Sequence, residues 1–129
     1  GRIINYPEQH IRNDIEKNNI SKYNFKKCVR IIKNMRIDMI SHGYNVPLQL
    51  SSFGLESLLW NVRESAYTKY SSVLRYTFDE VIDFLKNDYS NFPNYKEANG
   101  IKQLFVDTTV MDSYKKFITD LSNYYEYDI

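Results

Sequence analysis

The strongest constraint on the fold is a helical repeat of apolar residues in the first third of the chain. The residues that carry it lie three or four positions apart and are Phe25, Val29, Ile32, Met35 and Met39. This spacing is typical of one buried face of an α-helix. We therefore predict a helix from about Lys22 to His42, ended by Gly43. Cys28 lies within this apolar pattern, and we expect it to be a small buried residue.

The rest of the chain repeats this spacing, which predicts an all-α fold. The further helices are expected over about residues 6–18, from Ser51 or Ser52 onward, over about 72–87 and over about 110–127. The residues expected to face the core are Leu55, Leu58, Leu59, Val62, Leu74, Phe78, Val81, Ile82, Leu85, Tyr114, Phe117, Ile118 and Leu121. Since no segment of the sequence alternates as a strand does, we predict one compact bundle of about five helices, a single domain over residues 1–129.

One loop and one short element interrupt the helical pattern. Pro93 and the Asn99-Gly100 pair are turn signals, so residues 91–100 are predicted to form a loop. Residues 101–106, with the sequence IKQLFV, follow as a brief element before the last helix.

Positive charge gathers on the predicted helix at residues 22–42. Between Glu16 and Asp38 there is no acidic residue, but the segment holds Lys17, Lys22, Lys26, Lys27, Arg30, Lys33 and Arg36. Lys26, Arg30 and Lys33 recur at i, i+4 and i+7, so they share a face. Clustered cations suit a phosphate-bearing ligand, and a helix start offers free backbone N–H groups to an anion. Together with the helix start at Ser51 or Ser52, this pattern indicates half of a nucleotide site.

The charge balance favours a small anion over bulk nucleic acid as the ligand. The formal net charge is +1. Residues 1–64 carry ten Lys or Arg and six Asp or Glu, and residues 65–129 carry seven and ten. A protein that wraps a duplex is expected to be much more basic.

Cysteine, histidine and hydropathy exclude several other classes. Cys28 is the only cysteine, which rules out an internal disulfide framework and a multi-thiolate metal site. His10 and His42 have no His or Cys three or four positions away, so the sequence predicts no metal ligands. No run approaches the roughly 18 apolar residues of a membrane span, and no signal peptide opens the sequence. We therefore expect no membrane association and a cytoplasmic location. Because the sequence begins with Gly-Arg and not with Met, we expect it to be part of a longer protein.

Three strings of the sequence resemble one protein family. They are YPEQHIRNDIEKNNISKYNFKKCVRIIKNMR, PLQLSSFGLESLLWNV and EANGIKQLF, followed by an amphipathic helix. In order and character they look like the C-terminal helical domain of nucleotidyltransferases related to cyclic GMP-AMP synthase and oligoadenylate synthase. The resemblance implies a nucleoside triphosphate substrate and a second-messenger or nucleotide-modifying activity, with antiviral defence as the setting.

The resemblance also implies roles for individual residues. Lys33 matches the core-helix lysine that reaches the triphosphate, and Ser52 matches the hydroxyl that shares it. Phe53 stands where the family places an aromatic ring against the base, and Lys26 or Arg30 would assist Lys33. Each has a structural alternative: a charge run is usually a solvated face, a serine at a helix start is usually a cap, and Phe53 can equally belong to the core.

The sequence lacks the family's catalytic groups. Members hold two Mg²⁺ ions with an Asp-x-Asp pair on a strand, preceded by a Gly-Ser loop. The nearest approaches here are Asp14-Ile-Glu16 in a predicted helix and Glu126-Tyr-Asp128 at the end of the sequence. We therefore expect this chain to bind no cofactor of its own, to be inactive alone, and to work beside an N-terminal catalytic domain that holds Mg²⁺.

Two other functions fit the sequence. In a protein–protein interaction module the cationic face would only be solvated. In a nucleic-acid-binding helical domain the same face would bind phosphates with a steep salt dependence.

Overall fold

The computed structural model describes residues 6–47, 50–70 and 72–127. In chain order the helices are α1 (Pro7–Ile20), α2 (Asn24–Ser41), α3 (Ser52–Trp60), α4 (Glu64–Thr68), α5 (Leu74–Asn87), the 3₁₀-helix η1 (Tyr89–Asn94) and α6 (Thr108–Tyr127). In these ranges the only β-type pairing is an isolated antiparallel bridge between Lys96 and Gln103. The predicted all-α class is confirmed.

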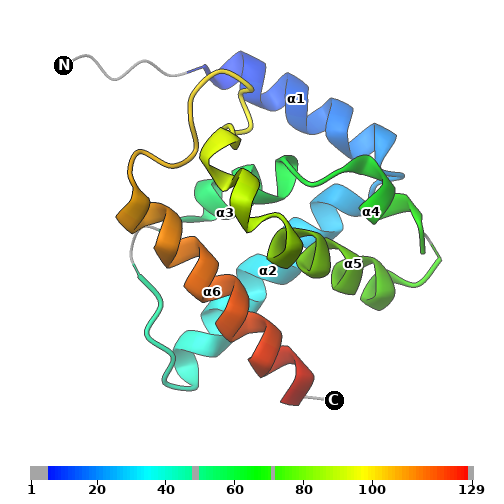
Figure 1. The fold of residues 1–129 in the computed structure, drawn as a ribbon. Coiled ribbons are helices and arrows are strands. Elements are labelled where there is room, and N and C mark those ends of the chain that lie inside the picture. Colours follow the sequence, from blue (N-terminus) through cyan, green and yellow to red (C-terminus); the bar gives the residue numbers. More distant parts are fainter. Residues whose placement is uncertain (1–5, 48–49, 71, 128–129) are drawn as a thin grey trace.

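The bundle is organised around α2, the helix predicted from the apolar repeat. This helix contacts each of the other five α-helices. In Figure 1, α1 crosses one end of the molecule, while α6 runs along the side away from it. The long segment between η1 and α6 passes close to the start of α1.

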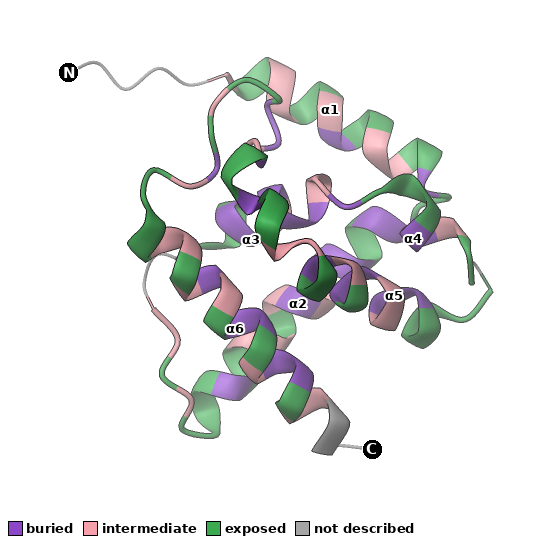
Figure 2. Ribbon diagram, viewed as in Figure 1, coloured by how far each residue is buried: buried purple, intermediate pink, exposed green. Residues whose placement is uncertain are grey.

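The inward faces of the helices form one core. Figure 2 shows the buried positions turned toward the interior of the bundle and the exposed positions turned outward. All but one of the core residues predicted for α3, α5 and α6 are buried, as are Phe25, Val29, Ile32 and Met39 of α2. Met35 packs against this core but is only partly buried.

Three local predictions need correction. Leu74 is 38% exposed, because it is the first residue of α5 and the inward position of that turn is taken by Thr77, whose hydroxyl donates to the Tyr70 carbonyl. Helix α4 was not predicted, since five residues are too short to show a repeat. The predicted loop from residue 91 begins later, because η1 continues to Asn94 with Pro93 inside it.

Hydrogen bonds fix the segment at residues 95–107 to α1 and α3. The Asn61 amide nitrogen donates to the Lys96 carbonyl at 2.7 Å, and its oxygen accepts from the Lys96 N–H at 3.0 Å. The buried Ser57 hydroxyl accepts from the Ala98 N–H at 3.0 Å. Asn13 of α1 donates to the Ala98 carbonyl at 2.9 Å. The segment is therefore part of the packed structure.

Cys28 is predicted to resist alkylation while the chain is folded. It is fully buried, as the sequence predicted, and burial raises the pKa of its thiol to about 12. The reactive thiolate is then nearly absent at about pH 8. Mass spectrometry after iodoacetamide treatment should find Cys28 unmodified in buffer and modified in denaturant, where the pKa returns to about 8.5. Rapid alkylation without denaturant would contradict the burial.

The helices that the structure describes include none with both the length and the apolar character needed to cross a bilayer.

Candidate functional site

The start of α3 resolves which serine caps the helix. The Ser51 hydroxyl accepts a hydrogen bond from the Gly54 N–H at 2.9 Å, and Ser51 has the extended backbone of an N-cap. Ser52 is therefore the first helical residue, and it is exposed. Its hydroxyl stands at the N-terminus of a nine-residue helix without serving as the cap. This position leaves the hydroxyl and the nearby free N–H groups able to meet an anion.

Lys33 lies on α2, the helix that contacts α3. The Arg36 guanidinium donates to the carbonyl of Leu50, which fixes the chain just before α3 to α2. Lys33 and Arg36 are three residues apart, so they lie within about 60° of each other around the helix axis. Helices α2 and α3 are also in direct contact. The Arg36 contact thus joins α2, three residues after Lys33, to the chain two residues before Ser52.

The other two predicted cations are exposed on the same helix. Lys26 and Arg30 are both exposed, whereas Lys33 is half-buried. Among the residues that the structure describes, no carboxylate forms an ion pair with Lys26, Arg30 or Lys33. The three positive charges are therefore not neutralised within the described chain.

Phe53 lies on the other side of the α3 start, facing α1. It is 38% exposed, so it is not a core residue. The His10 ring meets it edge-on, with the centroids 4.9 Å apart and the planes at 85°. Phe53 also lines a pocket of about 310 Å³ whose other lining residues are Tyr6, Pro7, His10, Glu97, Asn99 and Lys102. None of the three predicted cations of α2 lines this pocket.

A charged cluster that the sequence did not predict lies beside Phe53. His10 Nε2 is 2.8 Å from Asp14 Oδ2 and 2.9 Å from Glu56 Oε2. Burial, and then the nearby Glu56 carboxylate, raise the pKa of Asp14 to about 6. The cluster joins α1 to α3. That the chain has no metal ligands stays a prediction. It rests only on the lack of a second His or Cys near each histidine and does not consider carboxylates. The spacing of His10 and Asp14 at i and i+4 was the available signal, and Glu56 is close only in the folded chain.

Of the two carboxylate pairs closest to an Asp-x-Asp arrangement, the pair on α1 does not form one. Asp14 is buried and Glu16 is exposed on α1, so they point to different sides of the helix. In the second pair, Asp128 lies outside the described residues.

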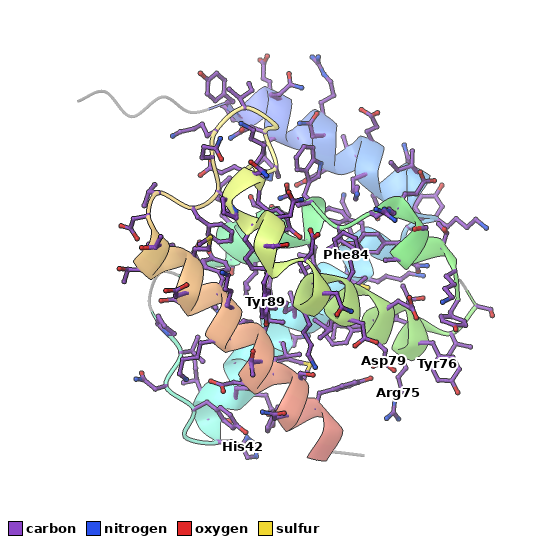
Figure 3. The ribbon with its side chains drawn as sticks, viewed as in Figure 1. His42, Arg75, Tyr76, Asp79, Phe84 and Tyr89 are labelled. Carbon is purple, nitrogen blue, oxygen red and sulfur yellow. The ribbon has the colours of Figure 1, made fainter. Side chains whose placement is uncertain are left out.

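A larger pocket lies between α4 and α5, away from the predicted residues. Its volume is about 520 Å³, and its charged lining residues are Arg63, Lys69, Glu80, Asp83 and Asp88. Arg63 is placed against the ring of Phe84, 5.9 Å from its centroid, and Lys69 pairs with Glu80. Figure 3 labels Phe84 on α5. Since three carboxylates line it, this pocket does not suit a phosphate group.

Comparison with protein families identifies the fold. Residues 12–126 match the family of cGAS/DncV-like nucleotidyltransferase C-terminal helical domains. A cyclic GMP-AMP synthase, CdnE03 from Staphylococcus schleiferi, is 43% identical over 126 residues, which are 98% of this chain and 39% of the relative. A cyclic dipyrimidine nucleotide synthase, CdnE from Cecembia lonarensis, is 35% identical over 79% of this chain and 34% of its own length.

A solved structure shows the same architecture. It is that of the Elizabethkingia meningoseptica CdnE cyclic dinucleotide synthase with GTP and Apcpp, with a TM-score of 0.84 and 31% sequence identity. The match covers 95% of this chain and 45% of that protein. This chain therefore spans less than half the length of each of these relatives. It belongs to the C-terminal helical domains of the cGAS/DncV-like nucleotidyltransferases.

Proposed function

We propose that this domain forms one wall of the nucleotide cleft of a template-independent nucleotidyltransferase that makes cyclic nucleotides. Lys33 and Ser52 bind the triphosphate of a nucleoside triphosphate, and Lys26 or Arg30 adds positive charge. Phe53 lies against the base, where stacking contributes roughly 1–3 kcal/mol.

The hydrogen bonding at the α3 start carries this proposal. Ser51 supplies the N-cap, so the Ser52 hydroxyl is not needed to begin the helix, and Ser52 is exposed. Among the described residues no carboxylate pairs with Lys33, and the ring of Phe53 is exposed at the start of α3, on the side that faces α1. The relatives' names support a nucleotide substrate, since they are cyclic nucleotide synthases and one was solved with GTP and a nucleotide analogue.

The chemistry itself belongs to the part of the protein beyond this chain. The described residues contain no pair of carboxylates on a strand, so they do not fit a two-metal phosphoryl-transfer site. We propose that Mg²⁺ is held by carboxylates of an N-terminal catalytic domain. The helical domain described here would then position the triphosphate and supply positive charge to it. Alone, the helical domain would not catalyse the reaction.

Substitution of Lys33 or Ser52 by alanine is expected to weaken nucleotide binding roughly tenfold or more, since each removes a hydrogen bond to a charged group. The measurement is an amide-resolved NMR titration of the domain with ATP, GTP, CTP and UTP, each with Mg²⁺. In the unsubstituted domain the shifts should centre on Lys33, Ser52 and Phe53, and the four titrations rank the bases. Binding by one isolated wall is expected to be weak, because most of the ligand stays in water.

Two matched controls separate binding from stability. Ser51→Ala should lower the free energy of unfolding by about 1 kcal/mol and leave phosphate binding unchanged. Ser52→Ala should weaken phosphate binding and leave the free energy of unfolding unchanged. Lys27, exposed on a different side of α2 from Lys33, serves as the charge control. Equal losses of nucleotide affinity in Lys27→Ala and Lys33→Ala would show that the helix attracts the nucleotide by its overall charge and not through Lys33. Shifts unchanged in both Lys33→Ala and Ser52→Ala would reject the site.

A further inference from the structure

The cluster of His10, Asp14 and Glu56 has the composition of a metal site. One ligand atom from each residue lies within 4.8 Å of the others. A zinc ion bound tetrahedrally at about 2.0–2.2 Å places its ligand atoms roughly 3.3–3.6 Å apart. The separations from His10 Nε2, 2.8 and 2.9 Å, are shorter than this by roughly half an ångström. Small side-chain movements would therefore complete the geometry.

The hydrogen bonding of the cluster is incomplete within the described chain. Nε2 carries at most one hydrogen, so it cannot give a full hydrogen bond to both Asp14 and Glu56. Asp14 is only 8% exposed, and its second oxygen, Oδ1, is buried with no hydrogen-bond partner among the described residues. A buried carboxylate oxygen without a partner is costly. These observations are independent of the cluster's composition, and a bound cation would satisfy the buried Asp14 oxygen.

We propose that His10, Asp14 and Glu56 bind one divalent transition-metal ion of the zinc type. The imidazole nitrogen favours zinc over magnesium or calcium, and the two carboxylates neutralise the ion's double charge. His10 also lines the 310 Å³ pocket, so solvent can supply a fourth ligand. The ion ties α1 to the first turns of α3. It also fixes the His10 ring against Phe53, next to the proposed nucleotide wall.

Cobalt titration of the tag-free, metal-stripped 129-residue chain tests this proposal directly. Four-coordinate Co²⁺ has intense visible absorption, so a bound ion reports its own geometry. We expect saturation at one equivalent, loss of the bands when Zn²⁺ is added, and their persistence when Mg²⁺ is added. Zn²⁺ should also raise the melting temperature, and EDTA should reverse the rise. This readout does not depend on nucleotide binding, so it can fail while the proposed function holds.

Two variants locate the ion. Glu56→Gln keeps the side-chain size and should weaken Co²⁺ binding by roughly 100-fold or more, since even outer-shell changes cost 10–100-fold. His42→Ala is the matched control, because His42 and Asp38 are also a helical histidine–carboxylate pair. His42 lies at the end of the molecule away from α1 (Figure 3). Full Co²⁺ affinity in Glu56→Gln, or no stoichiometric binding by the unsubstituted chain, would overturn the proposal and leave the cluster as an ion triad.

Discussion

Replacing Phe92 by alanine is expected to lower the free energy of unfolding by about 3–5 kcal/mol. Phe92 is fully buried in η1, and its ring centroid lies 5.2 Å from that of Tyr89, 4.7 Å from that of Tyr95 and 5.4 Å from that of Phe105. Alanine would remove the ring at the centre of this group and leave a cavity. The expected loss is a large part of the roughly 5–15 kcal/mol that stabilises a typical domain. Urea unfolding followed by circular dichroism measures it.

The control for this prediction is another aromatic residue at the surface. Tyr76 on α5 is 53% exposed and points away from the bundle (Figure 3). Tyr76→Ala should cost less than about 1 kcal/mol, because little buried surface is lost. Equal effects of the two substitutions would show that the group around Phe92 is not packed as described. Because Tyr95 and Phe105 flank the segment that reaches α1, Phe92→Ala should also loosen the pocket beside Phe53.

The long helices could be predicted from the sequence because their buried apolar residues recur every three or four positions within the helix itself. The spacing of Phe25, Val29, Ile32 and Met39 is enough to define α2 and its buried face. Short elements carry no such signal, so α4 was missed and η1 was assigned to a loop. These elements are held by contacts from elsewhere in the chain, such as the aromatic group around η1.

Part of the candidate site could also be predicted from the sequence. The residues Lys33, Ser52 and Phe53 came from a resemblance to a family. The choice between Ser51 and Ser52 as the cap needed the hydrogen bond to Gly54. For the His10 cluster, the sequence offers only the i, i+4 spacing of His10 and Asp14, because Glu56 is 46 residues from His10 in the chain. Proximity of that kind follows from helix packing, which the sequence pattern does not encode locally.

Gly54→Ala is expected to lower the free energy of unfolding by about 1–3 kcal/mol through overpacking. A Cβ atom added at Gly54 would lie 1.9 Å from Tyr114 Oη and 3.2 Å from Ser51 Oγ. Tyr114 on α6 is buried, and its ring packs edge-on against Phe105 with the centroids 5.0 Å apart, so it has little room to move. The Tyr114 side chain or the start of α3 must therefore shift. Chemical denaturation of the variant measures the cost.

A double-mutant cycle with Tyr114→Phe isolates this contact. Removing the Tyr114 hydroxyl takes away the atom closest to the added methyl group, although Cζ at 3.1 Å still limits the space. Gly54→Ala should then cost less in the Tyr114→Phe background, by about 0.5–3 kcal/mol of coupling. Strict additivity would mean that the tyrosine does not set the spacing of α3 and α6. Since Ser52 and Phe53 directly precede Gly54, a shift of α3 should also reduce the NMR response to nucleotide, and Tyr114→Phe should restore part of it. The helix contact at Gly54 would then be what holds the proposed nucleotide wall in position.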